Sequence, residues 1–272
     1  MRIGNKNFEE KNKTYIMGIL NITPDSFSDG GKWNQTDMAR DRVAGMIEEG
    51  MDILDIGGES TRPGYEKLSD QEEIERLIPV IRMVKQTFDI PISVDTYKSR
   101  VAAAVLEEGA DMINDIWGLK YDPDMGRVIA ASDASCCLMH NRDNRNYQDF
   151  FSDMLKDMEE TLVLADKANI ERERIMVDPG VGFAKTYENN LEAINSLEKL
   201  HVLGCPVLLG TSRKSVIGLT LDTPVTQRLE GTLATTVIAV MKGAGFVRVH
   251  DVKENKRVIQ MTESIMNGKR VI

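Results

Sequence analysis

The chain has little cysteine, and what it has forms no disulfide or metal-binding pattern. Among its 272 residues the three cysteines are Cys136, Cys137 and Cys205, which lie inside apolar stretches and show no CxxC spacing. An odd number without such spacing argues against a disulfide framework and against a zinc site. We therefore expect small buried thiols in a reducing compartment, and a cytoplasmic protein.

An excess of positive charge is also missing. Lys and Arg number 34 against 43 Asp and Glu, which gives a net charge of -9 and a pI near 5.0. This balance argues against an extended surface for nucleic acid or anionic membranes, although it permits a local basic pocket. No apolar run approaches the roughly 20 residues of a membrane span, and the charged start MRIGNKNFEEKNKTY lacks the apolar centre of a secretion signal. We expect a soluble protein that binds neither nucleic acid nor membrane.

Short apolar runs alternate with longer segments of helical period along the whole chain. The eight runs occupy residues 15–20, 51–56, 91–95, 111–115, 135–139, 174–178, 205–210 and 245–250. Strands that are apolar throughout are typical of a parallel sheet covered by helices. Eight such units in about 270 residues favour an α/β fold of the (β/α)8 TIM barrel type over a doubly wound open sheet. We predict a single barrel domain over residues 15–272, preceded by an N-terminal extension over residues 1–14.

Local signals also predict where some helices begin and bend. Ser69 and Glu72 form a capping-box pattern ahead of an apolar helical repeat. Pro79 falls inside that helix and predicts a kink or an irregular turn. Thr223 followed by Pro224 predicts the N-cap and first residue of another helix.

Nearly every predicted strand ends in a polar residue that a buried strand does not need. The members of this set are Asn21, residues 57–62, Asp95, Asn114, His140, Asp178, residues 211–215, Arg248 and His250. In a barrel the carboxyl ends of all strands meet at one rim, where active sites lie. A single strand-end Asp is usually a helix cap, but this many coincidences predict a site. We interpret His140, taken alone, as a structural loop residue.

The types of side chain at this rim indicate what it binds. Asp95, Asn114 and Asp178 supply acceptors for the N–H groups of an amino-heterocycle. A second group could bind an anion such as diphosphate or ligate a metal, and it consists of Asn21, Arg62, Arg248 and His250. Lys214 lies at the end of the seventh strand, and Ser215 could open a short helix whose N–H groups take a carboxylate. We predict a rim for a heterocycle, a phosphate-type anion and a second, anionic substrate.

Six blocks of sequence resemble the dihydropteroate synthase family, in order from about residue 15 to residue 255. They are MGILNITPDSFSDGG (17–31), DIGGESTRPG (55–64), SVDTYKSRVAAAVLEEGADMINDIWG (93–118), DPGVGFAKT (178–186), GTSRKSVIG (210–218) and RVHDV (248–252). The resemblance implies a TIM barrel that acts in folate biosynthesis. Such an enzyme joins 6-hydroxymethyl-7,8-dihydropterin diphosphate to p-aminobenzoate, releases pyrophosphate, and is inhibited by sulfonamides that compete with the second substrate.

The resemblance also implies roles for the residues at matching positions. The pterin-binding residues would be Asp95, Asn114, Met139, Asp178, Phe183 and Lys214. The diphosphate-binding residues would be Asn21, Thr61, Arg62, Arg248 and His250. The p-aminobenzoate-binding residues would be Phe27, Thr61, Pro63, Lys214 and Ser215. The cofactor would be Mg2+ held by Asn21 and Asp29, the catalytic residues would be Asp95, Lys214, Arg248 and His250, and the enzyme would be a homodimer.

The implied reaction is a dissociative substitution at the exocyclic methylene of the pterin, without a covalent nucleophile. Two positions depart from the family pattern: Ala184 stands where glycine is usual, and Val216 where a bulky aromatic residue is common. One alternative function is a methyltetrahydrofolate-dependent corrinoid methyltransferase, which shares the barrel but has no use for Thr61, Arg62 or the TSRKS block. The other is a non-catalytic pterin-binding paralogue, which should have lost part of the anion site.

Overall fold

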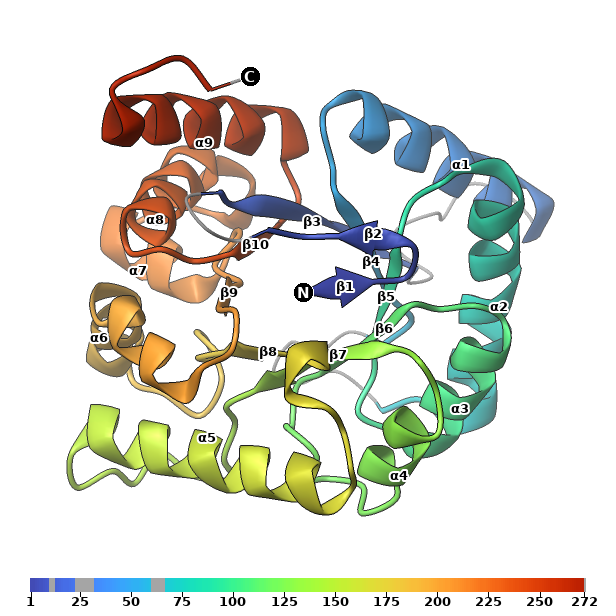
Figure 1. The fold of residues 1–272 in the computed structure, drawn as a ribbon. Coiled ribbons are helices and arrows are strands. Elements are labelled where there is room, and N and C mark those ends of the chain that lie inside the picture. Colours follow the sequence, from blue (N-terminus) through green and yellow to red (C-terminus); the bar gives the residue numbers. More distant parts are fainter. Residues whose placement is uncertain (10–12, 23–31, 60–66, 272) are drawn as a thin grey trace.

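A parallel sheet forms the centre of the computed structural model, which describes residues 1–9, 13–22, 32–59 and 67–271 (Figure 1). Within these ranges, eight strands lie in the order β8-β7-β6-β5-β4-β3-β10-β9. They are β3 (Tyr15–Asn21), β4 (Ile53–Gly57), β5 (Ile92–Asp95), β6 (Met112–Asp115), β7 (Ser135–Met139), β8 (Ile175–Asp178), β9 (Leu208–Leu209) and β10 (Phe246–Val249). A bridge between Val177 and Val207 joins the two ends of this row. The sheet is thereby closed, and the predicted (β/α)8 barrel is confirmed.

Helices surround the barrel on its outer face (Figure 1). They are α1 (Lys32–Glu48), α2 (Asp70–Thr87), α3 (Ser99–Glu107), α4 (Met125–Ala130), α5 (Phe150–Lys167), α6 (Tyr187–Asn195), α7 (Ser215–Leu221), α8 (Leu229–Met241) and α9 (Val252–Asn267). The main core lies between sheet and helices, where Leu77 and Ile81 of α2 pack with Ile56 of β4. Helices outside and side chains inside explain why the strands are apolar on both faces. The interior also contains the predicted buried thiols Cys136, Cys137 and Cys205.

The first helix start is confirmed. Ser69 Oγ accepts from Glu72 N at 3.3 Å, and Ser69 N donates to Glu72 Oε2 at 3.0 Å, which completes the capping box of α2. The helix then runs through Pro79 without a break. Pro79 is exposed, as is Glu75 one turn earlier. The carbonyl of Glu75, which loses its usual donor to the proline ring, can therefore be hydrated.

The predicted start of an α-helix at Thr223 and Pro224 is wrong. Thr223 and Pro224 lead only into a 3₁₀ turn over Val225–Gln227, and α8 begins at Leu229. The guanidinium of Arg228 donates to Thr223 O at 3.2 Å. It therefore occupies the carbonyl that the next turn of an α-helix would use.

A short antiparallel hairpin covers the amino-terminal end of the barrel, within the segment predicted as an N-terminal extension. Its strands are β1 (Arg2–Ile3) and β2 (Lys6–Asn7). Figure 1 shows the hairpin lying across the opening of the barrel. Phe8 follows it and packs against Tyr15 and Phe246, with ring centroids 4.9 and 5.7 Å apart. These residues form the floor of the barrel, opposite the rim where the strands end.

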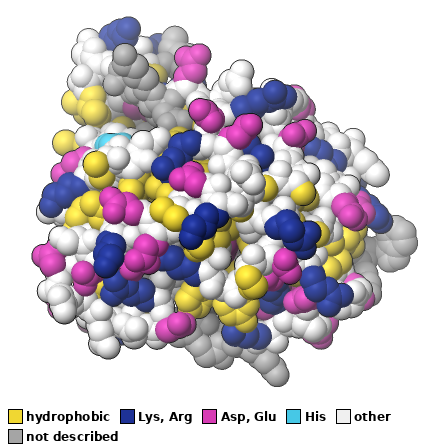
Figure 2. Space-filling view, turned by 60° about the horizontal axis from the view of Figure 1, so that its bottom comes forward, with side chains coloured by type: hydrophobic (Ala, Val, Ile, Leu, Met, Phe, Trp, Pro, Cys, Tyr) yellow, Lys and Arg dark blue, Asp and Glu magenta, His cyan; other side chains and the backbone are white. Residues whose placement is uncertain are grey.

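The surface mixes charges of both signs. On the face drawn in Figure 2, Lys and Arg side chains are interspersed with Asp and Glu, and short apolar areas lie between them. In the described ranges, no helix is both long enough and apolar enough to cross a bilayer.

Candidate active site at the carboxyl ends of the strands

The register of the strands brings predicted polar residues together at one rim. Asn21 is paired with Gly57, Gly57 with Asp95, and Asp95 with Asn114. Asp178 ends β8 at the same end of the barrel. The parallel direction of all strands is what collects residues so far apart in sequence.

Arg248 on β10 joins the carboxylates of Asp55 and Asp95. Its Nε donates to Asp55 Oδ2 at 2.6 Å, and its Nη2 donates to Asp95 Oδ2 at 2.8 Å. Asp55 is fully buried and also accepts from Ser93 Oγ at 2.6 Å and, weakly, from Asn114 Nδ2 at 3.5 Å. One guanidinium therefore neutralises only part of the negative charge at the centre of the rim.

One carboxylate oxygen of Asp95 lacks a hydrogen-bond donor among the described residues. In the described part of the chain, its Oδ1 is buried and receives no hydrogen bond. The pKa of Asp95 is raised to about 7, because burial and the nearby Asp55 and Glu73 outweigh the opposing effect of Arg248. A buried acceptor without a donor costs free energy. An N–H group of a bound ligand could supply the missing hydrogen bond to Asp95 Oδ1.

Asp178 and Lys214 form a second charged pair on the other side of the rim. Asp178 Oδ1 accepts from Gly180 N at 2.7 Å, while Lys214 Nζ donates to Val181 O at 2.5 Å and lies 4.9 Å from the centre of the Phe183 ring. Burial raises the pKa of Asp178, and Lys214 opposes this. Burial also lowers the pKa of Lys214 to about 8, against the attraction of Asp178. Each group thus helps the other to stay charged.

Gly210 lies against this pair, and an apolar cluster lies on the same rim. A Cβ atom at Gly210 would lie 3.4 Å from Asp178 Oδ2 and 3.8 Å from Lys214 Nζ, so a larger side chain there would cover both polar groups. Met139 is buried with Tyr97 and Ile116, and Phe183 packs against this cluster. The arrangement offers acceptors at the edge of a flat ligand and apolar contacts at its face.

Ser212 contacts both the backbone and the ring of His250. Ser212 Oγ accepts from His250 N at 3.2 Å and lies 2.9 Å from His250 Nδ1. Because a hydroxyl both donates and accepts, this contact orients the imidazole ring in either of its tautomers. Next along the chain, Arg213 is paired with Asp251 at 2.5 Å, and Ser215 begins α7 as predicted.

Part of the predicted site lies outside the described residues. This part comprises Phe27, Asp29, Thr61, Arg62 and Pro63. Asn21 is described, and it ends β3 as an exposed residue. Its Oδ1 lies 3.4 Å from the position of a Cβ atom at Gly57, so a larger residue there would crowd it. In the described ranges no three His, Cys, Asp or Glu side chains form a metal-binding group.

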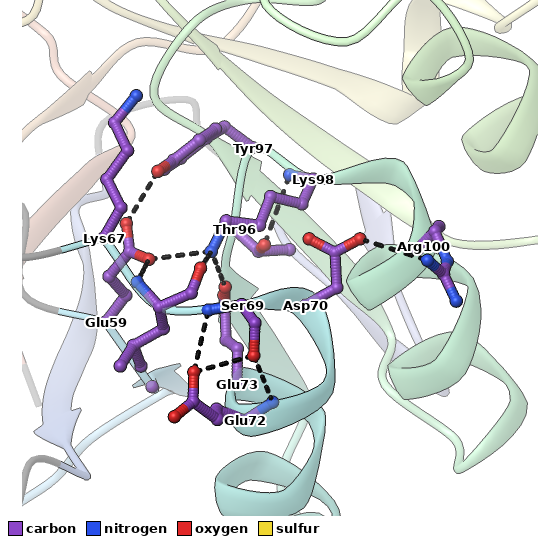
Figure 3. A network of polar contacts seen from close by, with 12 residues as sticks. Glu59, Lys67, Ser69, Asp70, Glu72, Glu73, Thr96, Tyr97, Lys98 and Arg100 are labelled. Carbon is purple, nitrogen blue, oxygen red and sulfur yellow. Dashed lines mark hydrogen bonds and ion pairs between the residues drawn. The ribbon is translucent and has the colours of Figure 1, made fainter.

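A network beside the rim was not predicted (Figure 3). Lys98 Nζ donates to Glu59 Oε2 and Glu73 Oε2, both at 2.7 Å, and to Leu68 O at 2.8 Å. Glu59 also accepts from Leu68 N at 2.8 Å and from Tyr97 Oη at 2.7 Å. Lys98 therefore cross-links the two ends of the β4–α2 connection and ties them to the start of α3, three residues after Asp95.

We expect the Lys98→Met variant to lose about 2–3 kcal/mol of folding free energy, because two largely buried carboxylates lose their shared cation. Lys85→Met is the matched control, since Lys85 pairs with Asp111 at 3.3 Å and is 40% exposed. That variant should lose less than about 1 kcal/mol. Urea unfolding at pH 7 measures both, and equal losses would contradict a supporting role for the network.

Some of the missed residues carried a visible signal. Asp55 lies within the apolar run MDILDI, and Lys98 follows closely on the strand that ends in Asp95. A charged residue among apolar neighbours has to find a partner or a ligand. Lys185, 4% exposed in the connection after β8, is another such residue.

Comparisons with known proteins agree with this geometry. A profile of the pterin-binding enzyme family matches residues 17–250. Over 267 residues, the chain is 57% identical to the dihydropteroate synthase of Clostridium beijerinckii, and the match covers 98% of this chain and 99% of that protein.

Solved structures show the same similarity. The dihydropteroate synthase of Clostridium difficile, determined in the presence of pteroic acid, superimposes with a TM-score of 0.91 at 48% identity and covers 97% of this chain and 98% of that chain. The Yersinia pestis enzyme with a sulfonamide drug complex gives a TM-score of 0.91 at 37% identity, with 99% of each chain covered.

Proposed function

The chain belongs to the dihydropteroate synthase family of pterin-binding enzymes, and from this premise we propose which of its residues perform each part of the reaction. It is a transferase that joins a dihydropterin diphosphate to p-aminobenzoate and releases pyrophosphate. The observation that carries the proposed roles is the buried, unsatisfied Asp95 Oδ1, which lies at the same rim as Asp178.

The pterin is bound between the two charged groups of the rim. Asp95 and Asp178 accept hydrogen bonds from its amino and ring N–H groups, and Asn114 complements them with an amide. Met139 and Phe183 contact its faces, a role supported by their membership of one apolar cluster. Lys214 maintains Asp178 as a carboxylate, which an N–H-rich ligand requires.

The diphosphate leaves from the side of β3 and β10. Arg248 and His250 donate to it, and the contact with Ser212 orients the His250 ring. Thr61 and Arg62, which lie outside the described residues, are assigned to the same anion by motif alone.

Asn21 and Asp29 are assigned to Mg2+. The amide oxygen of Asn21 is the kind of hard donor that Mg2+ takes, and few protein ligands suffice because substrate phosphates complete the coordination. Asp29 lies outside the described residues. When bound, the ion would neutralise negative charge on the departing diphosphate.

Catalysis is then mainly electrostatic. As the bond to diphosphate breaks, positive charge develops on the pterin, and the carboxylates of Asp95 and Asp178 stabilise it. The aryl amine of p-aminobenzoate attacks the methylene carbon without a strong base. This substrate is assigned to Ser215 and Lys214, and Phe27, Thr61 and Pro63, which lie outside the described ranges, are assigned to it by motif alone. Sulfonamides would compete at this second position.

The proposal extends to a cytoplasmic homodimer. Exposed apolar side chains gather on helices that pack against one another, and they are Leu219 and Leu221 of α7, Ile238 and Met241 of α8, and Met261, Ile265 and Met266 of α9. Such a set is typical of a surface that another chain covers.

We expect pyrophosphate release only when the pterin diphosphate and p-aminobenzoate are both present. Removal of Mg2+ with EDTA should slow the reaction by at least about tenfold, and added Mg2+ should restore it. A coupled pyrophosphate assay measures both effects. A methyltransferase would release no pyrophosphate, and a non-catalytic paralogue would bind pterin without turnover. Either result would contradict the proposal.

A further inference from the structure

Lys185 is a buried ammonium group with unusual partners. It lies in the connection between β8 and α6 and is 4% exposed. Its Nζ lies 2.9 Å from His140 Nδ1 and donates to Phe183 O at 3.1 Å. Among the described residues, no carboxylate forms an ion pair with it. Burial lowers the pKa of Lys185 to about 7, and the attraction of Asp178 opposes this.

The ring of His140 is oriented by a contact of its other nitrogen with Asp157. His140 Nε2 lies 2.9 Å from Asp157 Oδ2, and Arg142 donates to the same oxygen. Burial lowers the pKa of His140 to about 4, so the ring is neutral at pH 7. With its single proton on Nε2 and directed to Asp157, Nδ1 is left as an acceptor for the ammonium of Lys185. A chain from α5 through β7 thus orients Lys185.

The connection that Lys185 supports forms one wall of the pterin pocket. Gly180 N donates to Asp178, and Val181 O accepts from Lys214, so two of its peptide groups contact the charged pair of the rim. Lys185 holds a third, the carbonyl of Phe183. The position of the Phe183 ring under Lys214 therefore depends on all three contacts.

The connection between β8 and α6 contains a residue with a strained backbone conformation. Ala184 has φ +43°, in the left-handed region where the family usually has glycine. Tyr147 Oη donates to Ala184 O at 2.9 Å, and this hydrogen bond helps to keep Ala184 in the left-handed conformation. A strained residue between Phe183 and Lys185 persists only where its surroundings hold it.

Burying a charged side chain costs desolvation free energy that an apolar side chain does not. Replacing buried ionic groups by apolar residues of similar volume is often neutral or stabilising. A packing role would therefore be served better by an apolar side chain. A charge retained beside Phe183 and near Asp178 indicates a contribution to ligand binding rather than to folding.

We propose that Lys185, oriented by His140 and Asp157, is a positioning residue of the pterin pocket: it holds the Phe183 carbonyl, and with it the wall against which the pterin packs. The inference rests on the proposed function, because it concerns the same pocket. Lys185 needs no contact with the reacting atoms, and it acts through Phe183 and through its charge near Asp178.

The Lys185→Met variant tests this, because methionine keeps the length of the side chain and removes its charge. Calorimetry with 6-hydroxymethylpterin should show Kd raised by about tenfold, the effect of one charged hydrogen bond. The KM for the pterin diphosphate should rise by a similar factor, whereas kcat and the KM for p-aminobenzoate should stay within about threefold. The Tm should change little, because removal of a buried charge offsets the loss of the donor to His140 Nδ1 and Phe183 O.

Lys120→Met is the matched control. Lys120 donates to the carbonyl oxygen of Asp157 at 2.8 Å but touches no part of the wall. Its pterin affinity should equal that of the wild type. If Lys185→Met fails to fold, Asp157→Asn takes its place, because it removes only the far end of the chain. Its Kd should rise several-fold in the same direction.

Unchanged pterin affinity in folded Lys185→Met or in Asp157→Asn would overturn the inference. So would a lowered Tm with equal losses for both substrates, which would make Lys185 a packing residue. A wild-type protein that bound no pterin would instead refute the proposed function, and this inference with it.

Discussion

The Asp178→Asn variant is expected to lose measurable affinity for pterin while keeping its fold. The wild-type carboxylate offers acceptors to ligand N–H groups, whereas the amide turns its own N–H₂ group toward them. Such a mismatch costs about 2–4 kcal/mol, or roughly 30- to 1000-fold in Kd. Calorimetry with 6-hydroxymethylpterin measures it, and circular dichroism monitors the fold.

Asp111→Asn provides the control for this result. Asp111 also accepts a backbone hydrogen bond, from Ile92 N at 2.9 Å, but it precedes β6 at the opposite end of the barrel. Its variant should bind pterin as the wild type does. Equal affinity in Asp178→Asn would remove Asp178 from the pocket.

The second large effect is expected for Arg248→Met. Its guanidinium is the cation that joins the fully buried Asp55 to Asp95, whose side chain is 9% exposed, so its loss leaves two carboxylates without their partner. Breaking a buried pair in this way costs about 3–5 kcal/mol. Arg82→Met is the control, because Arg82 makes a comparable double contact with Glu108 but is 59% exposed. It should lose less than about 1 kcal/mol.

The effect of Arg248→Met should depend on pH. The pKa of Asp95 is raised from 3.8 to about 7 in the folded protein, so the folded state binds an extra proton between these values. Stability from this group is present below the unfolded pKa and is lost as the pH rises toward 7. Without Arg248 the folded pKa rises further, so the deficit should be larger at pH 8 than at pH 5. Urea unfolding at both values tests this, and a constant deficit would contradict it.

The barrel could be predicted from sequence because its signals are local. Each strand is one apolar run, and the parallel arrangement sends every strand end to the same rim. Asp95, Asn114 and Asp178 could therefore be placed together before their contacts were known. The helix start at Thr223 failed because a contact from Arg228 decides it.

The contacts within the rim could not be predicted. Arg248 was predicted as a diphosphate-binding and catalytic residue, yet it also binds Asp55, which is 193 residues away in sequence. That pairing exists because β10 and β4 both pair with β3, which brings the last strand of the chain close to the early ones. Lys185 was missed for a similar reason, since its partner His140 lies on the neighbouring strand's end, 45 residues earlier.

The floor of the barrel has a consequence for the order of events during synthesis. Ile3 and Phe8 are almost fully buried, and they share one apolar cluster with Phe246 of the last strand. On the ribosome, Phe8 emerges long before Phe246 exists. The hairpin and Phe8 therefore cannot pack against the last strand until nearly the whole domain has been made. Such long-range contacts form late and leave apolar surface open to association. A nascent chain stalled before β10 should therefore expose Ile3 and Phe8 to chaperones and proteases.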